Sequence, residues 1–294
     1  MGNTMKWIGS AVRGLRSFAY GPGDGRPRVG LALGGGFARG ISHIGVLRVL
    51  EEESIPVDYI AGTSVGALIA AGYASGATLD QMEAQGSGTH FRDFGRWTLS
   101  RMGMASNERL ENFLHKFTTA RFFEELKIPL SIVATDLIKG ESVYFTEGEI
   151  GPALRASCAY PGLFLPVEYR GRILVDGFLT EAVPTEAARR LGSSVIIAVY
   201  LEPGELKEKP RNTIEVIGRS FSIIQGTYEQ PWRNIADVVI EPNVHDVLWD
   251  GFALTPRLVA AGASAARAAL PSIKAVIERR TAPRHVHSPE EESR

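Results

Sequence analysis

Residues 31–47 read L-A-L-G-G-G-F-A-R-G-I-S-H-I-G-V-L, and this stretch decides the fold. It completes an apolar run, 29–33, that is typical of a buried strand; three glycines follow, and a helical pattern begins at Gly40. A glycine-rich turn from a strand into a helix directs several backbone N–H groups toward one point, where negative charge is favourable. The stretch therefore predicts a strand–loop–helix unit with a turn that stabilises an anion.

The same alternation continues along the chain and predicts an α/β fold, with a mostly parallel central sheet flanked by helices. The predicted strands are 29–33, 59–61, 130–135, 142–146, 172–175, 195–200 and 238–241, and the predicted helices include 40–53, 65–74 and 256–279. Residues 86–106 mix glycine, arginine and large apolar side chains without a period. This pattern predicts a loop or a cap over an apolar site.

The composition limits the classes of function. Of the 294 residues, 44% are hydrophobic and 22% are charged, as in an ordinary globular protein. The formal net charge of −1 produces no field that would attract a polyanion, so we expect no nucleic-acid partner. The single cysteine, Cys158, excludes an intramolecular disulfide, and we interpret it as a buried small residue rather than a nucleophile.

We expect one large domain, residues 28–280, between two terminal segments. Residues 1–27 lack the unbroken apolar stretch of a secretory signal, because Lys6, Arg13 and Arg16 divide them. On a helix, the apolar side chains of residues 5–18 face away from these cations, so this segment either lies on a membrane surface or docks on the protein body. Residues 281–294 are polar and contain prolines, which predicts a disordered tail.

An uncharged stretch between Asp58 and Asp80 is long enough to resemble a transmembrane span. It is rich in glycine, alanine and small polar residues, which make a poor lipid-facing helix. We therefore predict a buried strand, a turn and a helix in this part of the chain.

The turn in this stretch carries the sequence G-T-S-V-G, from Gly62 to Gly66. A nucleophile elbow is a sharp turn between a strand and a helix. Small residues around the serine let this turn tighten, so that the serine hydroxyl is exposed. The N-terminus of the following helix also favours developing negative charge. We therefore predict that Ser64 is a nucleophile in acyl transfer.

The glycine loop at 34–37 fits acyl transfer better than nucleotide binding. A G-x-G-x-x-G pattern that starts at Gly34 has Arg39 at its last glycine position, and a P-loop would need lysine where Ile41 stands. Acyl transfer needs backbone donors for a tetrahedral oxyanion, each worth about 3 to 4 kcal/mol. Residues 34–37 can supply such donors, and phosphate binding is the weaker alternative.

A serine nucleophile needs a base, and Asp176 is the best placed candidate. It follows the apolar run 173–175 and precedes Gly177, so a dry environment could raise its pKa toward that of a base. The alternative role for Asp176 is that of an aspartate that forms a turn.

Other titratable residues are weaker candidates for the base. A triad of Ser64, Asp176 and His245 is disfavoured, because only one strand–helix unit precedes the serine. Asp58 and Asp136 are also predicted to end strands, and His43 is predicted to be a residue through which its helix packs.

Three motifs in this order resemble the patatin-like phospholipase family, and specifically its bacterial members related to the esterase domain of neuropathy target esterase. They are G-G-G-F-A-R-G followed by H-I-G-V-L, then G-T-S-V-G-A-L, and then V-D-G. A fourth stretch, A-S-C-A-Y-P-G-L-F-L-P-V at 156–167, resembles the segment that precedes the aspartate in the family. The resemblance covers residues 28–280 and implies a patatin-like three-layer α/β/α fold.

The resemblance also implies a Ser–Asp dyad without histidine, carried onto Ser64 and Asp176, and a reaction that needs no metal or organic cofactor. It implies an oxyanion hole of backbone amides in the turn formed by Gly35, Gly36 and Phe37. The supporting motif positions are Gly34, Arg39, Gly40, Gly62, Gly66 and Gly177.

Two positions depart from the family pattern. Many members have glycine where Phe37 stands, so we expect Gly36 to be the better oxyanion donor and the Phe37 ring to narrow or line the acyl site. Phe178 follows Asp176-Gly177, where the family commonly has glycine or alanine, and this change could reshape the pocket.

Together these features predict a lipid acyl hydrolase that cleaves carboxylic ester bonds of phospholipids, lysophospholipids or related esters. An acyltransferase of the same fold and a non-catalytic, membrane-associated binding module are the alternatives. The expected partners are a lipid or ester substrate and, through residues 5–18, a membrane surface. The missing signal and the family resemblance predict a cytoplasmic protein, peripheral to the inner face of a membrane.

Overall fold

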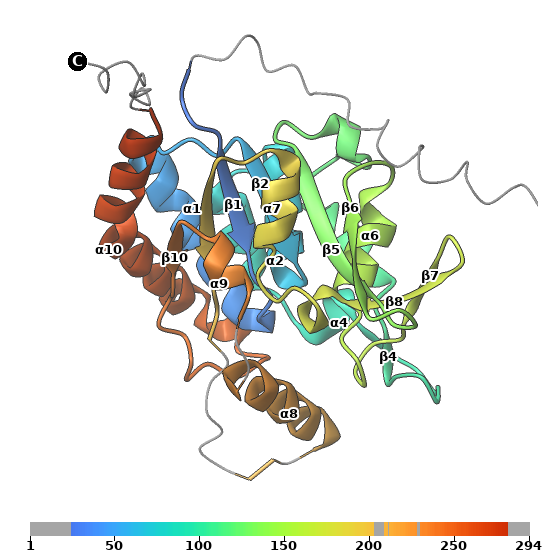
Figure 1. The fold of residues 1–294 in the computed structure, drawn as a ribbon. Helices are drawn as coiled ribbons and strands as arrows, with labels where there is room; N and C mark the ends of the chain where they lie inside the picture. The colour runs from blue at the N-terminus through green and yellow to red at the C-terminus, as the bar shows by residue number, and fades with distance from the viewer. Residues whose placement is uncertain (1–24, 203–208, 211, 228–229, 282–294) are drawn as a thin grey trace, which may run out of the picture.

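The computed structural model describes residues 25–202, 209–210, 212–227 and 230–281. Within them, an eight-stranded sheet has the order β10-β9-β1-β2-β5-β8-β7, and β6 pairs with β5 (Figure 1). Its strands are β1 (Val29–Leu33), β2 (Tyr59–Thr63), β5 (Leu130–Asp136), β6 (Glu141–Phe145), β7 (Val167–Tyr169), β8 (Arg172–Asp176), β9 (Val195–Val199) and β10 (Val238–Ile240). A separate pair consists of β3 (Arg96–Trp97) and β4 (Ala105–Ser106).

Five neighbouring strands, from β10 to β5, run parallel. Every residue of β1, β5 and β9 is buried, because helices cover both faces of a parallel sheet. This explains why these strands appear in the sequence as continuous apolar runs and not as alternating ones. In contrast, β6, β7 and β8 pair antiparallel with their neighbours.

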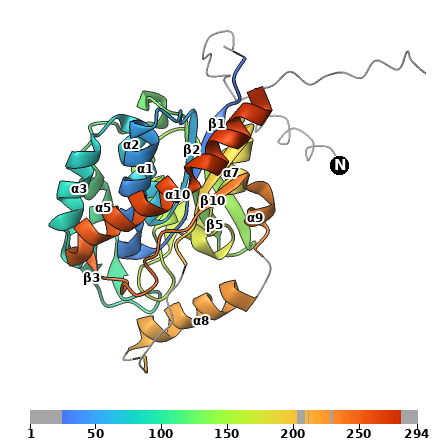
Figure 2. The same ribbon diagram turned by 90° about the vertical axis from the view of Figure 1, so that its left-hand side faces the viewer.

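Helices form a layer on each side of the sheet (Figures 1 and 2). The larger apolar core includes side chains of α1, α2, α6 and α10, and the smaller core on the other face includes Ala187 of α7 and Trp232 of α9. The helices are α1 (Ser42–Glu52), α2 (Val65–Ser75), α3 (Leu79–Ser87), α4 (Phe91–Phe94), α5 (Arg109–Leu114), α6 (Ile150–Ser157), α7 (Thr185–Leu191), α8 (Thr213–Thr227), α9 (Trp232–Ile235) and α10 (Thr255–Thr281). The described ranges also contain four short 3-10 helices, η1 (Phe37–Ile41), η2 (Phe123–Glu125), η3 (Gly177–Leu179) and η4 (Phe252–Leu254).

The α/β prediction is confirmed, and most of the predicted strands lie within one or two residues of their positions in the structure. The uncharged stretch after Asp58 forms β2 and α2, as predicted, and no helix among the described residues is long and apolar enough to span a membrane. Residues 86–106 contain more regular structure than the predicted loop, namely the end of α3, α4, β3 and β4. The predictions for residues 5–18 and 282–294 lie outside the described residues.

Candidate active site

The register of the sheet brings the ends of β2 and β8 together. Residues 132–133 of β5 pair with both β2 and β6, and residues 134–136 pair with both β6 and β8. Because a strand has only two hydrogen-bonding edges, β2 and β8 share the same edge of β5. They run in opposite directions along it, so their last residues, Thr63 and Asp176, pair with the adjacent residues Val133 and Ala134.

Ser64 follows the last residue of β2 and immediately precedes α2. Its backbone has φ 56° and ψ −125°, a conformation that costs a residue with a side chain about 1–3 kcal/mol. The Ser64 N–H donates to Oγ of Ser157, at the end of α6, over 2.9 Å. This strained turn, held by a buried hydrogen-bond partner, has the geometry that the sequence predicted for an elbow.

The hydroxyl of Ser64 donates directly to Oδ2 of Asp176 over 2.8 Å. The other carboxylate oxygen, Oδ1, accepts the Phe178 N–H over 3.0 Å. Asp176 is only 1% exposed, and this burial raises the pKa of its carboxyl to about 7, although the hydrogen bonds from Phe178 and Ser64 oppose the shift. A carboxylate with such a pKa can accept a proton near neutral pH.

The glycine loop lies against Ser64, since a Cβ added to Gly35 would be 3.3 Å from the Ser64 Cβ. The Gly35 N–H donates to the Ala182 carbonyl over 3.1 Å, so it is already occupied. The N–H groups of Gly36 and Phe37, at the start of η1, have no acceptor within the described part of the chain. The structure therefore narrows the predicted oxyanion donors from three residues to these two.

Arg39 holds the loop in place. Its Nε donates to the Gly36 carbonyl over 3.2 Å, and its Nη1 donates to the Glu202 carbonyl over 2.9 Å. Burial lowers the pKa of the Arg39 guanidinium. The Gly36 carbonyl belongs to the same peptide group as the Phe37 N–H, so the Arg39 contact orients that donor as well.

Phe37 adopts a left-handed backbone conformation, with φ 53°. Glycine adopts this conformation without strain, whereas a side chain must be held in it by its surroundings. The Phe37 ring packs edge-on against Tyr160 and Trp249, with ring centroids 4.9 and 5.8 Å away. These contacts explain how the loop tolerates phenylalanine, and the ring also lines the adjoining cavity, as predicted.

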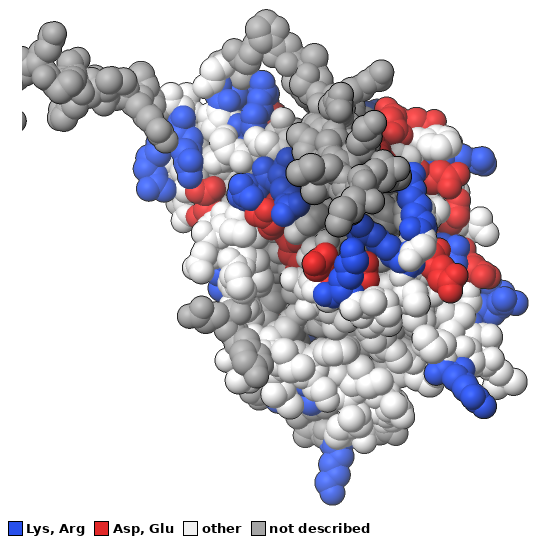
Figure 3. Space-filling view, turned by 45° about the vertical axis from the view of Figure 1, so that its right-hand side comes forward, with Lys and Arg blue, Asp and Glu red and all other residues white. Residues whose placement is uncertain are grey.

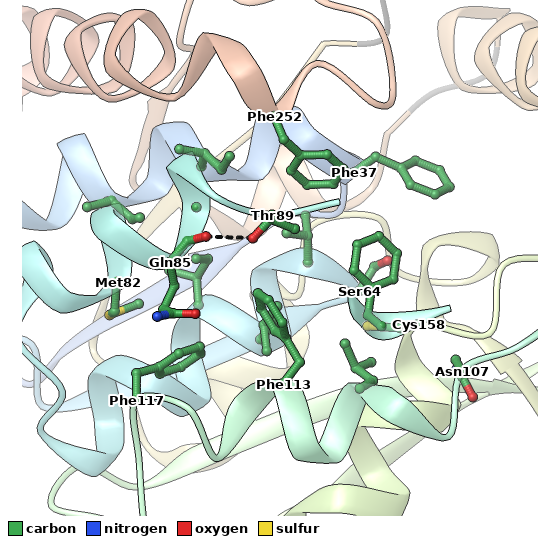
Figure 4. Close-up of a pocket in the computed structure, with 18 of the residues that line it drawn as sticks. Phe37, Ser64, Met82, Gln85, Thr89, Asn107, Phe113, Phe117, Cys158 and Phe252 are labelled. Carbon is green, nitrogen blue, oxygen red and sulfur yellow. Dashed lines mark hydrogen bonds between the residues drawn. The ribbon is translucent and has the colours of Figure 1, made fainter. Parts of the chain in front are cut away.

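A mainly apolar cavity of about 90 Å³ adjoins Ser64 (Figure 4). It extends from Ser64 and Cys158 past Phe113 toward Met82 and Gln85. The other residues that line it are Phe37, Ile41, Ile44, Val65, Leu68, Ile69, Gly86, Thr89, Phe94, Asn107, Leu110, Phe117, Phe164 and Phe252. Such a lining suits a hydrocarbon chain, with Ser64 at the end where its carbonyl group would lie.

Cys158 is part of the cavity wall and is less buried than predicted. Burial and the neighbouring Asp176 carboxylate raise the pKa of its thiol well above the usual value. The thiolate, which is the nucleophilic form, is therefore disfavoured at neutral pH.

The structure does not bring the weaker candidates to Ser64. Asp58 precedes β2 and does not end a strand, so that prediction is wrong: it lies at the opposite end of β2 from Ser64 and is paired with Arg26 over 2.6 Å. Although burial opposes the shift, hydrogen bonds from Arg26 and Val29 hold the pKa of Asp58 below its usual value. Asp136 ends β5 and accepts backbone N–H groups in the turn that follows.

The two histidines also have other roles. His245 is exposed in the connection after β10, and within the described residues no hydrogen bond joins it to Asp176. His43 is buried in α1, as predicted, and its Nε2 contacts the Gly34 carbonyl over 2.9 Å. Burial lowers the pKa of His43 to about 4, so the neutral ring donates to this carbonyl and supports the glycine loop.

The sequence prediction missed the residues that hold Ser64 and Asp176 in place. They are Ser157, whose Oγ accepts the Ser64 N–H, and Thr135, whose hydroxyl donates to the Asp176 carbonyl over 2.9 Å. Ser157 lies within the motif at 156–167, so the resemblance marked its segment but not its role. No group of three or more His, Cys, Asp or Glu side chains in the described ranges could hold a metal ion.

The sequence profile described as "Patatin-like phospholipase" matches residues 31–189, which contain the glycine loop, Ser64 and Asp176. The chain belongs to the patatin-like phospholipase family. An uncharacterised NTE family protein of Mycobacterium tuberculosis is 35% identical to it over 204 residues, which are 67% of this chain and 56% of that protein. Lysophospholipase nte1 of Aspergillus fumigatus is 29% identical over 225 residues, 74% of this chain and 14% of the relative.

This patatin-like chain thus spans little more than half the length of the mycobacterial relative and a small part of the fungal one. Among solved structures, VipD from Legionella pneumophila matches with a TM-score of 0.58 and 14% sequence identity. The match covers 85% of this chain and 67% of that chain. At this level of identity the likeness confirms the fold and carries no information about the substrate.

Proposed function

We propose that this patatin-like chain is a serine lipid acyl hydrolase with a Ser64–Asp176 dyad. The observation that carries the proposal is the 2.8 Å hydrogen bond from Ser64 Oγ to a buried carboxylate, next to an apolar cavity. The base needs no histidine, because the carboxylate itself has a pKa of about 7.

In the first step, Asp176 accepts the hydroxyl proton of Ser64 while Oγ attacks the ester carbonyl carbon. The carbonyl oxygen becomes an oxyanion, which accepts hydrogen bonds from the Gly36 and Phe37 N–H groups. When the tetrahedral intermediate collapses, the ester C–O bond breaks and the leaving alcohol takes the proton from Asp176. Donors that are fixed before the reaction lower the barrier, because they need no reorganisation as charge develops.

In the second step, water attacks the acyl group on Ser64. Asp176 again accepts the proton, the oxyanion forms in the same place, and the proton returns to Ser64 Oγ as the fatty acid leaves. The surrounding apolar cavity strengthens these interactions by excluding bulk water.

For the substrate class we propose phospholipid or lysophospholipid esters. The apolar lining of the cavity supports an acyl chain, and the lysophospholipase activity in the names of the fungal relatives supports this choice. The Arg39 guanidinium donates to the carbonyls of Gly36 and Glu202, so residues other than Arg39 would have to recognise the head group.

Labelling with a fluorophosphonate probe, mapped by mass spectrometry, tests the proposal. We expect label on Ser64 in the wild type, none in Ser64→Ala, and at least a hundredfold slower labelling in Asp176→Asn, because the base is then lost. The matched control is His245→Ala, which should label at the wild-type rate. Normal labelling of folded Asp176→Asn, checked by thermal melting, would refute the dyad.

Release of fatty acid from lysophosphatidylcholine, compared in the same variants, tests the substrate class. We expect free fatty acid as the product, and its release should depend on Ser64. Transfer of the acyl group to a second lysolipid, with little fatty acid formed, would instead identify an acyltransferase.

A further inference from the structure

Three large apolar side chains are exposed together on the β3–β4 hairpin. Trp97 is 62% exposed, Leu99 is fully exposed and Met102 is 59% exposed. Isolated exposed apolar residues are common on proteins, but three of them within six residues form a local apolar surface. The hairpin carries two arginines, of which Arg96 is paired with Glu108 over 3.7 Å and Arg101 is paired with no acidic side chain of the described residues.

Helix α8 presents a second surface of this kind. Its inner side packs Ile214, Ile217 and Phe221 on an aromatic cluster, whereas Val216 and Ile223 are each about half exposed on the other side. Ile224 is also about half exposed and lies two turns beyond Ile217, at the edge between the two sides. A helix with apolar side chains on two sides needs a second apolar environment to cover both. Both views show that α8 and the hairpin project at the same end of the molecule (Figures 1 and 2).

Both elements are packed against residues that border the candidate site. Trp97 stacks on Phe91 at 4.8 Å, and Phe91 stacks at 5.8 Å on Phe164, which lines the cavity. On α8, Phe221 contacts the ring of Phe178, two residues after the proposed base, at 6.3 Å. Both exposed surfaces are therefore connected through aromatic contacts to residues at or next to the candidate site.

Helix α8 carries one acidic residue, Glu215, and one basic residue, Arg219, and the cations of the two surfaces that have no ion pair among the described residues favour an anionic partner. In Figure 3 the acidic side chains gather in the upper part of the molecule, whereas the lower end has neutral side chains with separate lysines and arginines. Arg101 of the hairpin and Arg219 of α8 form no ion pair within the ranges that the structure describes. Arginines next to exposed aromatic and aliphatic side chains are the combination that binds an anionic lipid interface.

We propose that the β3–β4 hairpin and the outer face of α8 form a docking surface for an anionic lipid bilayer. This inference rests on the proposed function for the identity of the partner. On a bilayer, the apolar side chains enter the boundary between head groups and acyl chains, and the arginines contact lipid phosphates. The candidate site then lies close to the membrane, so an acyl chain has a short path from the bilayer to Ser64.

Vesicle cosedimentation of the full chain tests the docking surface, in a Ser64→Ala background so that the lipid is not consumed. The vesicles are phosphatidylcholine, with or without about one third phosphatidylglycerol. We expect tight binding only to the anionic vesicles, and at least tenfold weaker binding for Leu99→Ser/Met102→Ser and for Ile223→Ser/Ile224→Ser. The matched control is Phe122→Ser, an exposed apolar residue before β5, which should change binding less than twofold.

The same substitutions with Ser64 intact separate this proposal from the proposed function. Hydrolysis of a water-soluble short-chain ester should stay within twofold of wild type, whereas hydrolysis of vesicle lipid should fall in parallel with binding. If the soluble ester is not hydrolysed at all, the proposed function fails while the binding result still stands.

Two outcomes would overturn the docking surface. One is unchanged vesicle binding in both pairs of variants, since residues 5–18 are the same in every variant and could then be responsible. The other is an absence of vesicle binding together with a dimer, measured by analytical ultracentrifugation, that dissociates in these variants. That result would assign the surface to a second copy of the chain.

Discussion

Ser64 combines a strained backbone with a fixed hydroxyl. Its φ is 56°, and hydrogen bonds to Ser157 and Asp176 hold the amide and the hydroxyl. Asp176 is held in turn by the Phe178 amide. The cost of burying the carboxyl appears as its raised pKa, which is the property that a base requires.

The pH dependence of activity should report the Asp176 carboxyl directly. Only the ionised form accepts a proton, so kcat/KM for a soluble ester should rise with pH and level off above an apparent pKa of about 7. Below that pKa, activity should fall about tenfold per pH unit. An Asp246→Asn variant is the control, since this exposed aspartate is paired with Arg257 and should leave the profile unchanged. A flat profile between pH 5 and 9 would contradict Asp176 as the base.

At the scale of elements, the elbow depends on how closely α2 approaches the end of β1. A Cβ at Gly66 would overlap the Leu33 carbonyl oxygen and come 2.7 Å from that of Gly34. Glycine at this position therefore lets the first turn of α2 lie directly against the glycine loop. The spacing between Ser64 and the N–H groups of Gly36 and Phe37, the proposed nucleophile and oxyanion donors, follows from this backbone contact.

Gly66→Ala should consequently separate α2 from the loop. We expect the free energy of unfolding to fall by about 2–4 kcal/mol, and activity of the folded protein to fall about a hundredfold, because the reacting groups are displaced. Urea denaturation and ester hydrolysis measure the two effects. Gly226→Ala in α8 is the matched control, since its Cβ would meet nothing within 4 Å, and its stability should change by less than about 1 kcal/mol. Equal effects for the two variants would contradict the contact.

At the scale of the whole molecule, the C-terminal helix closes the fold against its first helix. A Cβ at Gly262 of α10 would overlap the Ser42 carbonyl oxygen of α1, and one at Gly45 of α1 would overlap the Val259 carbonyl oxygen of α10. The family match ends at residue 189, so α10 lies beyond it. Because α1 continues directly from the glycine loop, this distant helix also supports the site.

Gly262→Ala should therefore affect the site from a distance. We expect the free energy of unfolding to fall by about 1–3 kcal/mol, because the two backbones must separate. Labelling of Ser64 by the probe should slow as the loop shifts. Ser264→Ala, on the exposed side of α10, is the control and should stay within about 0.5 kcal/mol of wild type in thermal and urea unfolding. Wild-type stability in Gly262→Ala would show that α10 packs less closely than described.

Local patterns in the sequence determined the central strands, the glycine loop, and Ser64 at a strand–helix turn. They could do so because burial on both faces selects continuous apolar runs, and tight turns select glycine. The same reasoning placed Asp58 at the wrong end of its strand, because a charged residue beside an apolar run can stand either before the strand or at its end. It also gave no indication of α8, or of the hydrogen bond from the Ser64 N–H to the Ser157 hydroxyl.

Only the tertiary structure decided which groups meet. Asp176 reaches Ser64 because β2 and β8 share one edge of β5. The Gly35 N–H cannot serve a substrate because it already donates to the Ala182 carbonyl. The Ser64–Asp176 and Gly35–Ala182 hydrogen bonds each join residues more than a hundred positions apart. The pattern of apolar and polar residues indicates which side chains a segment buries. The acceptor of a given backbone N–H depends on how distant segments pack together, which the local pattern does not contain.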